Sequence, residues 1–252
     1  MKLLTDIGLL FWRKMKETLR NPIYILTSLL TPVIYLALFS PLLKGLRGVP
    51  GLGGNVLNVF IPGLLAIIAF LGGLFVGYNM IDEVRNGVVE RFRVTHTSRF
   101  ALLAGRVLRD MVNMLVIITV FVVISIPFGF SPDVAGFLVF VPLLCLLLVT
   151  TSSFGNALGL LLRDEDRLSP IVQGVNLPIL LLSGMLLPME LAPTWLQVIA
   201  HFNPVFYIVE AGRALVAGHV LDVKVGEAYL FMVPLTIVTV WWATQAFKKA
   251  IA

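Results

Sequence analysis

The stretch from Asp82 to Arg99 holds the densest charge in the chain and is the first place where chemistry could occur. It reads DEVRNGVVERFRVTHTSR, so Val88, Val89 and Phe92 can form an apolar strip beside charged neighbours. A short helix with one aromatic side chain and a charged rim suits a pocket on another protein. A solvated loop held at lipid headgroups is the alternative, and these residues alone leave both open.

Familiar catalytic patterns are absent from the sequence. It contains no His-Glu-x-x-His metal motif, no Gly-x-Ser-x-Gly elbow and no Gly-x-x-x-x-Gly-Lys-Ser/Thr phosphate loop. The three histidines, His96, His201 and His219, are scattered over the predicted cytoplasmic and outside loops, and the single cysteine, Cys145, lies in an apolar run. We therefore assign no catalytic residue, no metal site and no cofactor to this chain.

Six long apolar stretches must position the charged loop. Of the 252 residues, 58% are hydrophobic and 13% are charged, whereas about 25% are charged in a typical soluble domain. Each stretch is about as long as a bilayer-spanning helix. The predicted spans are 23–43, 56–81, 107–130, 137–162, 170–187 and 228–247. We predict an all-α polytopic membrane protein with a single six-helix transmembrane domain over residues 23–247.

Charge is almost absent from these spans. We expect no ionisable residue to lie buried within them, and we count Arg109, at the start of the third span, with the cytoplasmic segments. A proton- or sodium-driven carrier usually holds a buried carboxylate or histidine as a relay. We expect no such relay here, so any transport would draw its energy from elsewhere.

Residues 1–22 are predicted to form an amphipathic helix at the membrane interface. At 100° per residue one side collects the apolar residues Leu3, Leu4, Ile7, Leu10, Phe11 and Met15. The opposite side is polar and mostly basic, and Leu9 and Lys14 break the pattern. A basic amphipathic helix rests its apolar face at the headgroup boundary.

The distribution of Lys and Arg predicts that both termini are cytoplasmic. With the N-terminus inside, 15 of the 19 Lys and Arg residues fall in cytoplasmic segments, and only Lys44, Arg47, Arg213 and Lys224 lie outside. This is the positive-inside bias of membrane proteins, and it supports an even number of spans. We therefore attribute the net charge of +5 to contact between basic residues and lipid headgroups. The sequence has no basic patch with interleaved aromatic residues, so we do not expect nucleic-acid binding.

Residues 188–227 are predicted to lie outside, yet they remain largely apolar. Pro193 can start a short helix, and the pair Asn203-Pro204 can end it before a second helix from Val205 to Val216. We expect a helical hairpin between the fifth and sixth spans that lies at the interface or is partly re-entrant.

Two pairs of glycines four residues apart allow close helix packing. They are Gly73 with Gly77 and Gly155 with Gly159. Small residues at this spacing let helix backbones approach in membranes. We predict packing within one chain, with contact between subunits as the alternative.

The charged loop and the external segment resemble the permeases of type-2 ABC transporters. The first cytoplasmic loop of that family reads roughly Glu-x-x-x-Gly-x-x-Glu-x-Leu, then Thr-Pro, then Gly-Lys or Gly-Arg. The matching residues here are Glu83, Gly87, Glu90, Thr95 and Gly105-Arg106. Phe92 replaces the usual Leu. The second match comprises LSGMLLP at 182–188, LAPTWL at 191–196, Asn203-Pro204 and EAGRAL at 210–215.

This resemblance implies a half-transporter that pairs with a second permease, as a homodimer, and docks onto two separate ABC ATPase subunits that carry ATP and Mg. It implies that cytoplasmic residues 82–106 form the main coupling loop. The implied ATPase-coupling residues are Glu83, Arg85, Gly87, Glu90, Arg91, Phe92, Arg93, Arg163, Asp164 and Glu165. The candidate substrate contacts, on the second and fifth spans, are Phe70, Phe75, Tyr78, Asn176 and Ser183.

The expected function is outward transport of an amphipathic small molecule or lipid-like substrate across the plasma membrane of a prokaryote. A polysaccharide-exporting permease of the same family is one alternative. A stand-alone channel would conduct without an ATPase and would show a continuous polar stripe, which the spans lack. An intramembrane enzyme would lose turnover when His201, Glu210 or His219 is changed.

Overall fold

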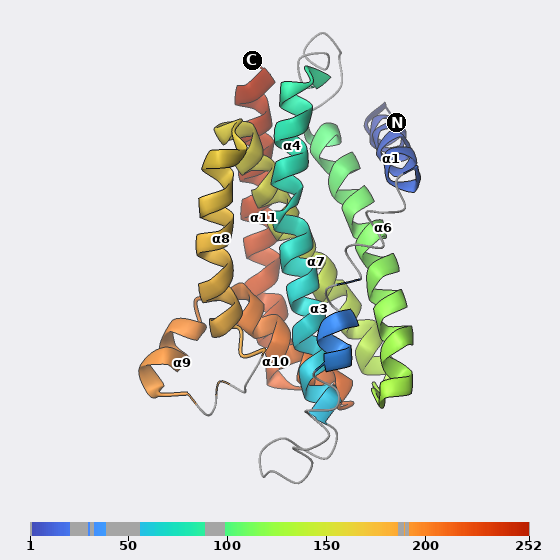
Figure 1. Cartoon of the computed structure of the whole chain (residues 1–252), viewed down its shortest axis with the longest axis vertical. Helices are drawn as coiled ribbons and strands as arrows, with labels where there is room; N and C mark the ends of the chain where they lie inside the picture. The colour runs from blue at the N-terminus through green and yellow to red at the C-terminus, as the bar shows by residue number, and fades with distance from the viewer. Residues whose placement is uncertain are drawn as a thin grey trace.

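The computed structural model describes residues 2–20, 30, 33–38, 56–88, 99–185, 189 and 192–251. Every regular element in that part is helical, which confirms the all-α class. The elements are α1 (Lys2–Leu19), α3 (Val56–Leu74), α4 (Val76–Arg85), α6 (Arg99–Ser125), the 3-10 turn η1 (Ile126–Phe128), α7 (Val134–Leu162), α8 (Glu165–Leu182), α9 (Thr194–Ala200), α10 (Pro204–Val216) and α11 (Val223–Ile251). The long helices run side by side, with both termini at one end and α9 and α10 at the other (Figure 1).

Four helical runs among the described residues are long and apolar enough to cross a membrane. They are Val56–Arg85, Phe100–Phe128, Val134–Leu162 and Val223–Lys249. They correspond to the second, third, fourth and sixth predicted spans. The first predicted span, 23–43, lies mostly outside the described residues, although 33–38 are helical.

The fifth predicted span, 170–187, corresponds to α8, which begins earlier, at Glu165, and ends at Leu182. Glu165, Asp166 and Arg167 occupy its first turn, so its uncharged part is shorter than the about 20 apolar residues that a spanning helix needs. The segment 186–188 lies outside the described residues. The helix therefore exists where predicted, with different bounds.

The central helix is α7, against which α3, α4, α10 and α11 all pack. A helix that is apolar on all sides is expected to be surrounded by others. Asp133 caps its start, because the carboxylate accepts a hydrogen bond from the backbone N–H of Gly136 at 2.8 Å. At its other end Arg163, a predicted coupling residue, adopts a left-handed φ of 53° and ends the helix.

The two glycine pairs bring the second span against α7. A Cβ at Gly77 would lie 2.8 Å from the carbonyl oxygen of Gly155, and a Cβ at Gly159 would lie 2.5 Å from the carbonyl oxygen of Gly77. Those distances are too short for a real side chain, so the backbones touch only because these positions are glycine. The predicted packing within one chain is confirmed.

The two short helices predicted within residues 188–227 form close to the positions that the prolines predict. Asn203 starts α10, since its side-chain oxygen accepts a hydrogen bond from the backbone N–H of Val205 at 3.0 Å. The amide of the same side chain donates to the carbonyl of Ile179 on α8 at 2.9 Å. Asn203 thus separates α9 from α10 and fastens the start of α10 to α8.

We expect Gly73→Ala to destabilise the protein and Gly72→Ala to leave it nearly unchanged. A Cβ at Gly73 would overlap the Thr151 hydroxyl and lie 2.7 Å from the backbone nitrogen of Ser152, whereas the nearest atom at Gly72 is 4.0 Å away. Overpacking of this kind costs about 1–3 kcal/mol. Thermal unfolding of the purified permease in detergent measures the difference, and equal midpoints for the two variants would contradict the close approach.

Candidate functional site at the base of the charged loop

The N-terminal helix α1 packs along α6 with its predicted apolar side inward. Ile7, Leu10 and Phe11 are partly buried, and a Cβ at Gly105 of α6 would lie 2.8 Å from the Cβ of Leu10. The apolar side of α1 therefore contacts protein, while Trp12 on another side is exposed. The position of this helix at the membrane interface stays a prediction.

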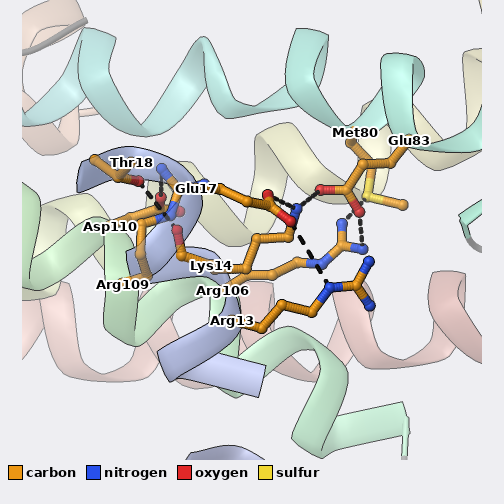
Figure 2. Close-up of polar contacts among 9 residues, drawn as sticks. All are labelled: Arg13, Lys14, Glu17, Thr18, Met80, Glu83, Arg106, Arg109 and Asp110. Atoms are coloured by element: carbon orange, nitrogen blue, oxygen red, sulfur yellow. Dashed lines mark hydrogen bonds and ion pairs between the residues drawn. The ribbon is translucent and has the colours of Figure 1, made fainter. Parts of the chain in front are cut away.

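Glu83, near the end of α4, joins three helices. Its carboxylate pairs with the ammonium of Lys14 from α1 and with the guanidinium of Arg106 from α6, as Figure 2 shows. The side chains of Glu83, Lys14 and Arg106 are only 15%, 13% and 7% exposed. Lys14 also pairs with Glu17 at 2.7 Å. Ion pairs this shielded are little screened by salt, and loss of one partner leaves an unpaired charge.

Arg106 extends this ionic network to α11 and to another turn of α4. Its guanidinium donates to the sulfur of Met80 and lies over the ring of Phe247, 5.6 Å from the ring centroid. A cation over a ring face is attracted by the ring quadrupole. Four helices, α1, α4, α6 and α11, therefore meet around one charged pair.

A second charged pair lies one turn further along α6. Arg109 pairs with Asp110 at 3.2 Å, and the other carboxylate oxygen of Asp110 accepts from the Ser152 hydroxyl of α7 at 2.7 Å. Asp110 is 6% exposed. The expectation that the spans hold no buried ionisable residue is therefore wrong, because Asp110 lies within the third predicted span. The bundle tolerates this carboxylate because it is paired, hydrogen-bonded and turned away from lipid.

The structure brings together two of the segments predicted to contact an ATPase. Arg85, the last residue of α4, pairs with Glu165, the first residue of α8, and both side chains are about half exposed. Gly87 follows with a left-handed φ of 66°, which turns the chain into the loop. Asp164 caps α8 by accepting from the backbone N–H of Asp166 at 2.9 Å.

The middle of the predicted coupling loop, with Glu90, Arg91, Phe92 and Arg93, lies outside the described residues. Its ends are helical: α4 continues to Arg85 and α6 already begins at Arg99. The predicted loop 82–106 is therefore shorter at both ends. Glu83 belongs to a helix and faces its neighbours, not solvent.

The predicted substrate contacts do not gather at one point. Phe70 lies in the hydrophobic core and Ser183 is fully buried, with its hydroxyl donating to a backbone carbonyl. Phe75 is 46% exposed, and its ring centroid lies 6.0 Å from that of Tyr78. Asn176 on α8 is partly exposed. The structure therefore pairs two of the five residues, both on the second span.

A family model described as ABC-2 type transporter matches residues 5–217. The chain belongs to this family. The daunorubicin resistance ABC transporter permease protein DrrB1 of Streptomyces coeruleorubidus is 28% identical over 237 residues, which cover 90% of this chain and 82% of the relative. The protein ycf38 of Cyanophora paradoxa, named as a transport permease, is 31% identical over 201 residues, with coverages of 78% and 69%.

A more distant relative is ABC transporter G family member 20 of Dictyostelium discoideum, 28% identical over 155 residues, which cover 58% of this chain and 21% of the relative. Membership of the ABC-2 family makes this chain a membrane-spanning permease subunit and implies an ABC ATPase partner. The matched range includes both charged pairs of α6 and the helices α9 and α10.

Sequence reasoning does not identify Lys14, Arg106 or Asp110 as members of a network. The position of Lys14 on the apolar side of the predicted amphipathic helix does indicate an ion pair, because a cation there needs a carboxylate partner. Nothing in the spacing selects Glu83 as that partner, since the contact joins residues far apart in the chain. Only the packing of α1 across α6 and α4 reveals it.

We expect Lys14→Met to loosen α1 and Lys16→Met to have little effect. Removal of Lys14 leaves part of the Glu83 charge uncompensated in a shielded site, at a cost of about 2 kcal/mol. Lys16 lies on the exposed side of the same helix, over the ring of Trp12. Hydrogen exchange of the α1 amides, followed by mass spectrometry, should quicken at least tenfold in Lys14→Met only. The same rate in both variants would contradict a docking role for Lys14.

Proposed function

We propose that this chain is the permease of an ATP-driven exporter that moves an amphipathic small molecule or a lipid-like molecule outward. The observation that carries the proposal is the position of Glu83, which ties three helices together at the base of the loop expected to contact the ATPase. The permease would supply the passage. Energy would come from a separate ATPase, which would bind the ATP and Mg.

The network offers a route by which force on the loop would reach the spans. α4 ends at Arg85, directly before the loop. Glu83 connects α4 to α1 and α6, and Gly77 packs it against Gly155 of α7. A displaced loop would thus carry a group of helices with it, which is the kind of packed element that passes on a conformational change. The pair Arg85–Glu165 would connect the loop to the second cytoplasmic segment proposed to contact the ATPase.

Cargo contacts are proposed on the second and fifth spans. Phe75 and Tyr78 present two rings on the α4 side, and Asn176 adds an amide on α8. A second permease copy, as a homodimer, would cover part of the apolar surface that this chain exposes, such as Leu177 and Leu181 of α8. The relative named for daunorubicin resistance favours a drug-like cargo over the polysaccharide of the second candidate function.

The proposed topology has six spans, cytoplasmic termini and a plasma membrane location in a prokaryote. Both termini lie at the end of the bundle that carries the basic network (Figure 1). At the opposite end the helical hairpin exposes Trp195 and Phe202, 63% and 80%. Aromatic side chains of this kind favour the membrane interface, which supports an external hairpin that rests in the outer leaflet.

Cysteine labelling of intact cells tests this topology. In a Cys145→Ser background, we expect Leu221→Cys, a position that is 99% exposed between α10 and α11, to react with a membrane-impermeant maleimide. Lys248→Cys, near the end of α11, should react only after permeabilisation. The reverse labelling pattern would show that the protein has the opposite orientation in the membrane, which would contradict the proposed contact with a cytoplasmic ATPase.

Substitutions in and below the loop separate docking from force transfer. We expect Phe92→Ala to reduce both co-purification of the ABC ATPase with tagged permease and daunorubicin efflux at least tenfold, because a buried aromatic anchor is worth about 2 kcal/mol or more. Glu83→Gln should keep the ATPase bound yet lower efflux, since it weakens the link to α1 and α6. Co-purification is read by mass spectrometry and efflux by drug fluorescence in cells.

The matched control is Phe100→Ala, an exposed aromatic residue in the first turn of α6, just after the loop. It should leave ATPase binding and efflux at the wild-type level. Wild-type co-purification in Phe92→Ala would argue against the docking role of this loop. Wild-type efflux in Glu83→Gln would argue against transfer of force through the network.

A further inference from the structure

A pocket opens at the end of the bundle that carries α9 and α10, opposite both termini. Its volume is about 200 Å³, and it lies between the end of α9, α10 and the start of α11. Its chemically active side chains are His201, Phe206, Tyr207, Glu210, Lys224 and Glu227. None of them belongs to the network around Glu83, so this pocket is a separate site.

Aromatic rings form one wall of the pocket. The rings of Phe206 and Tyr207 meet edge to face with centroids 5.6 Å apart, and the His201 ring lies 5.2 Å from that of Phe206. Tyr207 also stacks on Phe231 of α11 at 4.6 Å, and its hydroxyl donates to the His201 carbonyl at 3.0 Å. These contacts fix the rings in place, and aromatic faces attract cations through their quadrupole.

Two carboxylates line the pocket, and one of them is already neutralised. Glu210 pairs with Arg213 at 2.8 Å and with Lys224 at 2.7 Å. In the part of the chain that the structure describes, no Lys or Arg pairs with Glu227, which is exposed. Burial and then the charge of Glu227 raise the pKa of Tyr207, so this carboxylate acts on the aromatic wall.

This combination favours one class of ligand. An anion would meet Glu227 and the negative ring faces, because Lys224 is already engaged by Glu210. A neutral apolar group would gain nothing from the carboxylate. An ammonium group with alkyl substituents is attracted both by the charge of Glu227 and by the faces of the aromatic rings. The volume is smaller than the about 300–1,000 Å³ of a site for a whole drug, so it suits the ammonium-bearing part of a larger molecule.

We propose that this pocket binds an alkylated ammonium group, held against Phe206 and Tyr207 and paired with Glu227. Two sources carry that chemistry, namely amphipathic cations in solution and the choline headgroup of a lipid. The binding is an equilibrium property of the permease and needs neither ATP nor the ATPase. It therefore holds or fails independently of the proposed exporter function.

Choline and its neutral isostere 3,3-dimethyl-1-butanol are suitable probes. The full-length permease is placed in nanodiscs of phosphatidylglycerol, whose headgroup has no ammonium group, and binding is measured by saturation-transfer NMR. We expect choline to bind at least tenfold more tightly than the isostere. Equal binding would show that charge is not recognised and would overturn the proposal.

Variants tie the binding to the pocket. Glu227→Gln keeps the size of the side chain and removes its charge, and Phe206→Leu removes a ring; each should weaken choline binding about fivefold or more. Asp6→Asn makes the same carboxylate-to-amide change in α1, at the other end of the bundle, and should bind choline as the wild type does. Wild-type affinity in Glu227→Gln would overturn the proposal even if Phe206→Leu failed to fold.

The source of the ammonium group is decided by a second lipid. In nanodiscs that contain phosphatidylcholine, loss of choline binding would show that the lipid headgroup fills the pocket. Retained choline binding would assign the pocket to a soluble amphipathic cation. Either result supports ammonium recognition, and the variants above apply to both.

Discussion

A carboxylate at the end of α4 holds two cations from different helices, Lys14 of α1 and Arg106 of α6. Removing each charge from water costs several kcal/mol, which is recovered only while the partners stay in contact. The three helices therefore remain joined or separate with a large penalty, and intermediate distances are disfavoured. Breaking this contact is therefore close to an all-or-none step, and the contact fixes the end of α4 relative to α1 and α6.

The second span is also held at its other end and in its middle. Arg213 of α10 donates to the backbone carbonyl of Val59 near the start of α3 at 3.1 Å, and Gly77 lies against Gly155 of α7. α3 and α4 meet at Phe75, between these fixed points. A movement that begins at Glu83 must therefore either carry α1, α6 and α7 along or change the angle between α3 and α4.

The sequence predicts those features of the fold that depend on local patterns. The length of the apolar stretches predicts four of the long helices, and Asn203-Pro204 predicts the break between α9 and α10. The two glycine pairs predict the close packing of the second span against α7. The start of α6 was misplaced because Arg106 and Asp110 lower the hydropathy of its first turns. Arg106 is compensated by Glu83 of α4, and Asp110 is held by its neighbour Arg109 and by Ser152 of α7; no local pattern predicts the contacts with other helices.

The two ends of the bundle use the same chemistry, but they differ in whether every carboxylate is paired with a cation. At the end with the termini, Glu83 is surrounded by paired partners, and the described carboxylates of the network all have a cation. At the opposite end, Glu210 is likewise held between Arg213 and Lys224, which fastens α10 to α11. Among the described residues, Glu227 beside it makes no ion pair with Lys or Arg. A carboxylate that is held by cations can only fasten helices together, whereas one without such a partner next to aromatic rings can attract a cation from outside.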